Sequence, residues 1–108
     1  MTDNIVVLCT CGSQEEADRL ADLLVGKRLA ACVTLIPGVQ SVYRWKGAIE
    51  RSREFLLMIK TSQKCFKQMN AELAKAHSYD VPEVIALPIV DGSAAYLEWI
   101  AESLENVT

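Results

Sequence analysis

The sequence has no apolar run approaching the roughly 20 residues needed to cross a bilayer, and it has no block or stripe of basic residues. The first absence argues against a membrane partner, and the second removes the electrostatic signature of a nucleic-acid-binding surface. The acidic start, residues 1–4, lacks the positive charge and the cleavable apolar stretch of a secretory signal. We therefore expect a cytoplasmic protein that binds neither nucleic acid nor membrane.

The sequence also lacks the spacings of a closed structural metal site and of common catalytic motifs. It has a single histidine, and its four cysteines form no C-x-x-C pair. Without a secretory signal, we expect these thiols to be reduced. A glycine-rich phosphate loop and a recognised Ser-His-Asp motif are both absent. We therefore expect a binding protein and not an enzyme.

The length of 108 residues predicts a single domain over residues 1–108. Apolar residues make up 51% of the chain, which is slightly rich for a small monomer. Such a surplus suggests that some apolar surface is buried against another chain.

The order of apolar patterns predicts an α+β fold. Strands are expected over residues 5–9, 31–45, 47–60 and 84–89, and helices are expected to begin at Ser13, at Thr61-Ser62 and at Ser93. This order is β-α-β-β-α-β with a C-terminal helix, which is typical of a ferredoxin-like antiparallel sheet with its helices on one face.

The two central strands predict a hairpin that is too long for its own domain. Each would span roughly 45–50 Å at about 3.3 Å per residue, whereas a compact chain of this length has a diameter of roughly 35 Å. The hairpin must bend sharply at Pro37-Gly38 or project from the domain. Because a projecting hairpin has exposed edges that invite aggregation, we expect sister chains to cover it in a closed ring, with Tyr43 and Trp45 at the interface.

Five segments together resemble one known family, the CutA divalent-cation tolerance proteins. They occur in the family's order from Ile5 to about Ile100, and their combination is far more specific than any one alone. The segments are LAACV (29–33), PGVQSVYRWKG (37–47), IKT (59–61), HSYDVPEVIALP (77–88) and YLEWI (96–100). The resemblance implies a stable homotrimer, a role in tolerance of copper and other divalent metals, and metal binding by some members.

The resemblance also implies a metal site, because the family's proposed ligands correspond to Cys9, His77 and Glu83. Two residues depart from the family pattern: Ser78 replaces a proline that would stiffen the turn, and Ala76 replaces a second histidine found in some metal-binding members. We expect any copper or other divalent cation to be weakly bound and not required for folding.

Each candidate ligand also has a structural interpretation. Cys9 and Cys11 lie two residues apart on a strand, so both face one way and could hold Cu(I), but Cys9 could equally be a small core residue. His77 suits copper or zinc, yet it could instead satisfy the last carbonyls of its helix. Glu83 could bind a cation or pair with Lys60 or an arginine.

Two further functions remain open from the sequence. The expected fold and trimer also resemble nitrogen-regulatory signalling proteins, which bind small effectors in clefts between subunits. In that case Lys60, Tyr79 and Trp99 are the candidate cleft residues, although Trp99 could simply pack in the core or at an interface. The third function is a structural trimer that anchors an unidentified protein partner.

Overall fold

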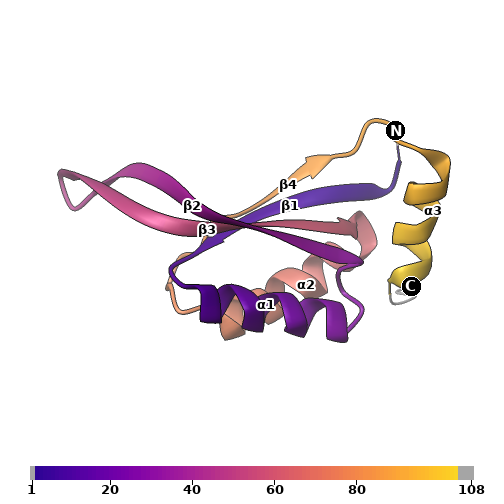
Figure 1. Ribbon diagram of the computed structural model, residues 1–108, viewed down its shortest axis with the longest axis horizontal. Coiled ribbons are helices and arrows are strands. Elements are labelled where there is room, and N and C mark those ends of the chain that lie inside the picture. The colour runs from indigo at the N-terminus through magenta and orange to yellow at the C-terminus, as the bar shows by residue number, and fades with distance from the viewer. Residues whose placement is uncertain (1, 105–108) are drawn as a thin grey trace.

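The computed structural model describes residues 2–104 and has four strands and three helices in that range. The sheet is antiparallel, with the strand order β2-β3-β1-β4. The elements are β1 (Asn4–Cys11), α1 (Gln14–Gly26), β2 (Cys32–Trp45), β3 (Ala48–Ser62), α2 (Gln63–Ala76), β4 (Val84–Pro88) and α3 (Ala94–Ser103). The predicted α+β order is confirmed, and Figure 1 shows α1 and α2 lying side by side under one face of the sheet.

All three helices begin where the sequence predicts, because each start is determined by a local serine cap. The hydroxyls of Ser13, Ser62 and Ser93 each accept a hydrogen bond from the backbone N–H three residues later, at 3.1, 3.3 and 3.3 Å. Each cap satisfies a backbone donor that the helix itself cannot pair.

The core lies between this helical pair and the near face of the sheet. Leu20 and Leu24 of α1, together with Met69 and Leu73 of α2, are fully buried there. They pack on alternate residues of the two central strands, which are Val7, Cys9, Leu57 and Ile59. The period of two along these strands therefore gives the helices an apolar surface to cover.

The opposite face of the sheet is covered by no helix among residues 2–104 (Figure 1). Strand register brings its side chains into apolar rows, because Leu8 pairs with Met58 on one side and with Ile85 on the other. Ile85 and Leu87 are 49% and 46% exposed. The residues of this face, which we call the bare face, are Val6, Leu8, Ile36, Leu56, Met58, Ile85 and Leu87.

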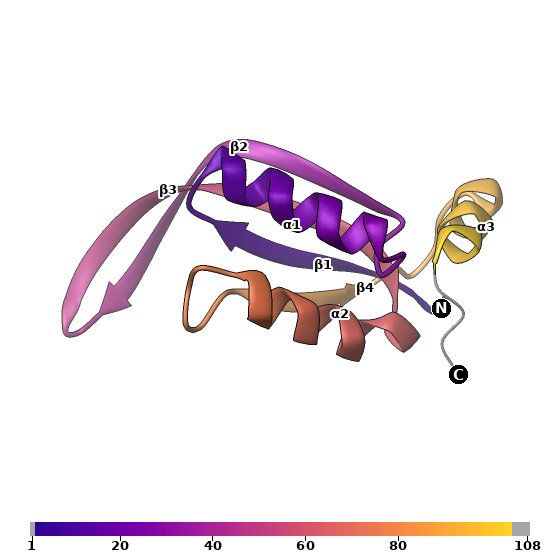
Figure 2. The same ribbon diagram turned by 90° about the horizontal axis from the view of Figure 1, so that it is seen from below.

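The hairpin formed by β2 and β3 both bends and projects. A register irregularity lies between Ile36 and Val39, and Gly38 has a φ of 71°, a left-handed value that glycine adopts without strain. Beyond this point the hairpin curves and extends past the helices (Figure 2). The longest dimension of the described chain is 44 Å, which exceeds the roughly 35 Å diameter of a compact chain of this length, and the hairpin projects from the domain (Figure 2).

Helix α3 lies at the end of the sheet away from the hairpin tip (Figure 1). The Asn4 side-chain amide donates to the Leu97 carbonyl at 3.3 Å, and the Arg28 guanidinium donates to the Glu102 and Ser103 carbonyls at 3.0 and 3.3 Å. None of the helices in residues 2–104 is long and apolar enough to span a bilayer.

Candidate functional site

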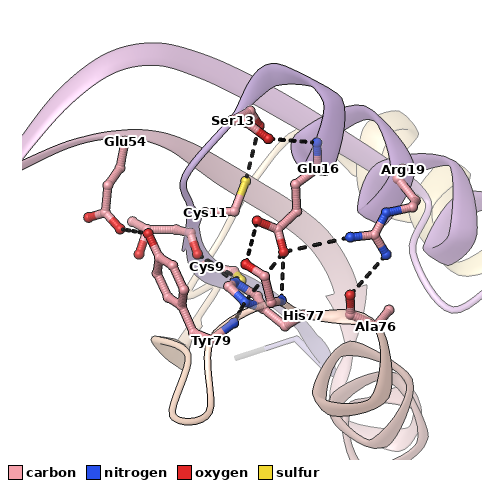
Figure 3. A network of polar contacts seen from close by, with 11 residues as sticks. Cys9, Cys11, Ser13, Glu16, Arg19, Glu54, Ala76, His77 and Tyr79 are labelled. Atoms are coloured by element: carbon pink, nitrogen blue, oxygen red, sulfur yellow. Dashed lines mark hydrogen bonds and ion pairs between the residues drawn. The ribbon is translucent and has the colours of Figure 1, made fainter.

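A cluster of polar and sulfur-bearing side chains occupies the end of the sheet nearest the hairpin. Figure 3 shows Cys9, Cys11, Glu16, His77 and Tyr79 grouped there. They come from the end of β1, the first turn of α1 and the loop that follows α2. The sequence brings them together because β1 leads directly into α1 and because α2 runs back along α1.

His77 is buried and uses both ring nitrogens. Its Nδ1 accepts a hydrogen bond from the Tyr79 N–H at 3.0 Å, so Nε2 carries the proton and donates to the Thr10 carbonyl at 2.8 Å. A metal ion could reach this imidazole only if one of the two contacts opened. Within one chain, His77 therefore acts as a link between the end of β1 and the loop after α2.

Glu16 joins the same loop to α1. Its carboxylate accepts hydrogen bonds from the Ser78 N–H at 2.7 Å and from the Ser78 hydroxyl at 2.9 Å. Burial raises the pKa of this carboxyl, but the two hydrogen bonds from Ser78 and the nearby His77 together outweigh that effect. The net result is a pKa below the ordinary value of 4.5. Because proline has no N–H and no hydroxyl, a proline at position 78 could not make these two contacts.

Cys9 and Cys11 both lie in the core, as their spacing on β1 predicts. Burial, together with the neighbouring Cys11, Glu83 and Glu16, raises the pKa of the Cys9 thiol to about 12. Burial also raises the pKa of Cys11. The thiolate is the form that binds metals, so a metal at Cys9 would have to displace a tightly held proton.

Glu83 is exposed and lines a groove of about 830 Å³ between the loop after α2 and the hairpin. Its charge is one of those acting on Cys9, so Cys9, His77 and Glu83 belong to the same end of the molecule. Among residues 2–104, however, no group of three or more His, Cys, Asp or Glu side chains is arranged to hold a metal ion.

The other candidate ligand residues are separated within the chain. Lys60 donates to the Thr34 hydroxyl at 2.6 Å and to the Met58 carbonyl at 3.3 Å. Trp99 stacks on Tyr96 with 5.5 Å between ring centroids, on α3 at the far end of the sheet. Tyr79 is at the hairpin end, so a single subunit does not assemble Lys60, Tyr79 and Trp99 into one cleft.

The two aromatic residues predicted at an interface lie exposed on the projecting hairpin. Tyr43 is 43% exposed and Trp45 is 57% exposed. The Tyr43 hydroxyl lies 2.7 Å from the Ser52 hydroxyl across the hairpin, which orients that ring.

Two buried carboxylates, Glu16 and Glu54, were not among the residues predicted from the sequence. Glu16 lies three residues after the Ser13 cap, at the spacing of a capping box, which accounts for its place without indicating a contact with the loop after α2. Glu54 accepts a hydrogen bond from the Tyr79 hydroxyl at 2.9 Å and is only 6% exposed. Its one signal in the sequence is position, because it places a charge in the alternate row that continues with the apolar Leu56 and Met58.

A four-stranded antiparallel sheet with helices on one face, a projecting hairpin and a polar cluster at the sheet end define a ferredoxin-like α+β subunit. Residues 5–103 match the family described as CutA1 divalent ion tolerance protein. The chain belongs to this family, and the resemblance seen in the sequence is confirmed.

Relatives and solved structures agree with this assignment. The chain is 44% identical to the divalent-cation tolerance protein CutA of Thermus thermophilus over 91% of this chain and 95% of that protein. It is 46% identical to the chloroplastic protein CutA of Arabidopsis thaliana over 95% of this chain, but it spans only 57% of that protein's length. A solved structure of the Thermus thermophilus protein superposes with a TM-score of 0.93 at 42% identity, covering 94% of this chain and 99% of that chain.

Proposed function

We propose that this divalent-cation tolerance family member acts in the cytoplasm as a homotrimer that binds copper or another divalent cation weakly, and that it is a binding protein and not an enzyme. Family membership supports the link to divalent cations. The observation that carries the assembly is the bare face together with the projecting hairpin. No disulfide joins the cysteines among residues 2–104, which suits a reducing compartment.

Burial of apolar surface favours the trimer. Among residues 2–104, thirteen large apolar residues are exposed, and they concentrate on the hairpin, the bare face and α3. A soluble subunit rarely leaves so much apolar surface open to water. Sister chains that pack on the bare face and pair with the hairpin edges would bury it, and a closed ring would leave no free edge.

The metal role is proposed for Cys9, His77 and Glu83. A thiolate, an imidazole and a carboxylate suit a borderline ion such as copper. Since Cys9 must lose a proton and His77 must release a hydrogen bond, we expect weak binding that strengthens as pH rises. We also propose that folding does not require the ion, since hydrogen bonds within the chain satisfy both ring nitrogens of His77.

Native mass spectrometry and copper titration under anaerobic conditions test both parts. We expect a trimer mass at micromolar concentration, and weaker copper binding after Cys9→Ser or His77→Ala. Cys32→Ser is the matched control, because Cys32 is half-buried and lies outside the polar cluster. A monomer mass would contradict the assembly, and equal copper affinity in Cys9→Ser, His77→Ala and the control would contradict the site.

The groove beside Tyr79 favours a second candidate function, that of a signalling trimer with a small-molecule effector. Its volume of about 830 Å³ is within the range of small-ligand pockets. A trimer could also bring Lys60 of one chain towards Tyr79 of another. Electron density for a small molecule in this groove, with no metal near Cys9, would favour this function.

A further inference from the structure

The groove between the hairpin and the loop after α2 has an unusual charge distribution. Its lining includes three carboxylates, from Glu54, Asp80 and Glu83, and no lysine, arginine or histidine among the described residues. Its apolar wall is formed by Val42, Trp45, Val81 and Pro82. The groove therefore presents negative charge beside an apolar and aromatic surface.

Glu54 is the residue in this groove that most needs a partner. It is 6% exposed, and its one described contact is the hydrogen bond from the Tyr79 hydroxyl. No ion pair among residues 2–104 involves it. A carboxylate that is taken out of water without a cation nearby is costly, whereas a carboxylate paired with a cation is not.

Among the described residues, no cationic side chain of the hairpin forms an ion pair with Glu54. Arg53 is adjacent to Glu54, so the alternation of a strand directs its side chain to the opposite face. Tyr79 remains a hydrogen-bond donor, because burial and the Glu54 carboxylate both raise the pKa of its hydroxyl. Glu54 is thus held in place by Tyr79 and lacks a counter-charge.

We infer that this groove binds a small organic cation, an ammonium or guanidinium group on a short apolar or aromatic body, with Glu54 as its anchor. The charged group would donate to Glu54, and its apolar body would lie against Val81 and Pro82. A divalent metal fits less well, since hard cations need about six oxygen ligands and no metal-binding group is found in residues 2–104.

This inference shares only Glu83 with the proposed copper site. Cys9 and His77 do not line the groove, whereas Glu83 does. Cys9→Ser should therefore leave binding of the organic cation unchanged, so either proposal can fail alone.

Calorimetric titration of the full chain in its native oligomeric state, in phosphate buffer, tests the inference. The probes are benzylamine, which is protonated at neutral pH, and benzyl alcohol, which is its uncharged counterpart. We expect benzylammonium to bind and benzyl alcohol to bind roughly tenfold more weakly, because a charge-assisted hydrogen bond is lost. Glu54→Gln should weaken benzylammonium binding by a similar factor. Glu50→Gln is the matched control, since it lies on the same strand outside the groove lining and should bind as the wild type does.

Three results would overturn the inference. Equal binding of the two probes would mean that the groove is only an apolar surface. Unchanged affinity in Glu54→Gln would remove the anchor. Failure of the wild type to bind benzylammonium, with a changed native mass in Glu54→Gln, would mean that a basic side chain of a second copy occupies the groove. If Glu54→Gln does not fold, the comparison of benzylammonium with benzyl alcohol on the wild type still shows whether the groove selects a cation.

Discussion

Glu16 connects the first turn of α1 to the loop after α2 through its two hydrogen bonds from Ser78. Arg19 adds to the connection, because its guanidinium lies 3.7 Å from the Glu16 carboxylate and donates to the Ala76 carbonyl at 2.9 Å. The loop held in this way carries Tyr79 and Glu83, which line the groove. A buried carboxylate outside the groove therefore positions part of the groove wall.

The lowered pKa of Glu16 makes its contribution to stability depend on pH. A carboxyl whose pKa is lower in the folded chain stabilises the fold above its unfolded pKa, and this stabilisation is lost as pH falls through the folded pKa. We expect Glu16→Gln to reduce the free energy of unfolding by about 1–2 kcal/mol at neutral pH, because charge-assisted hydrogen bonds are lost. The difference from the wild type should shrink as the pH falls below 4.5.

Urea unfolding at a series of pH values, at one fixed protein concentration, measures this difference. Glu15→Gln serves as the control, because Glu15 is an exposed neighbour in the same turn and none of the described contacts joins it to Ser78. A Glu16→Gln difference that stays constant down to acidic pH would contradict the linkage.

At the scale of elements, the local sequence predicted where helices begin better than it predicted where strands end. The three serine caps are each complete within four residues, so the helix starts could be predicted. Strand β1 was expected to end at Cys9, but it continues to Cys11 because Thr10 and Cys11 pair with Leu56 and Phe55 of β3. Strand β4 ends at Pro88, one residue before the expected end, at a sheet edge where a missing N–H is tolerated.

The candidate site was predictable only in part, for the same reason. Cys9, His77 and Glu83 followed from the family resemblance, and the shared face of Cys9 and Cys11 followed from strand alternation. The contacts that determine their chemistry join residues far apart in sequence, such as Glu16 with Ser78 and Glu54 with Tyr79. No local pattern specifies such pairs, because they depend on how α2 and the hairpin pack.

Arg28, in the turn after α1, connects that turn to the end of α3. Arg28 has a φ of 59°, which costs an L-residue energy, and its guanidinium donates to two carbonyls at the end of α3. We expect Arg28→Ala to lower the free energy of unfolding by about 1 kcal/mol, since it loses these contacts and keeps the strained backbone. Arg28→Gly should recover part of that loss, because glycine adopts this φ freely.

Chemical denaturation of the two variants in parallel measures the effect. An Arg28→Gly variant less stable than Arg28→Ala would show that backbone strain at this turn is unimportant.

At the scale of the whole molecule, the subunit is asymmetric. One sheet face is covered by α1 and α2 and the other is bare, while the hairpin extends beyond both (Figures 1 and 2). The bare face consists of residues that alternate with core residues along β1, β3 and β4. The same strands that build the core therefore also build an apolar outer surface, which is where the proposed trimer would form.

A charge on the bare face should prevent that assembly without unfolding the subunit. Ile85 lies on the edge strand β4 and is 49% exposed in the single chain, so lysine can extend into water there when the chain is alone. Between packed subunits the same lysine would be buried without a partner, at a cost of several kcal/mol. If the chain forms the proposed trimer, we expect Ile85→Lys to be a monomer that keeps the wild-type circular dichroism spectrum.

Light scattering after size-exclusion chromatography measures the mass. Ala71→Lys is the matched control, because Ala71 is an exposed position on α2 and a lysine there should leave the mass unchanged. Because a subunit stabilised by its neighbours unfolds more easily at low concentration, the wild-type melting temperature should rise with protein concentration while that of Ile85→Lys should not. An Ile85→Lys protein with the same mass as the wild type would show that the bare face is not where the chains meet.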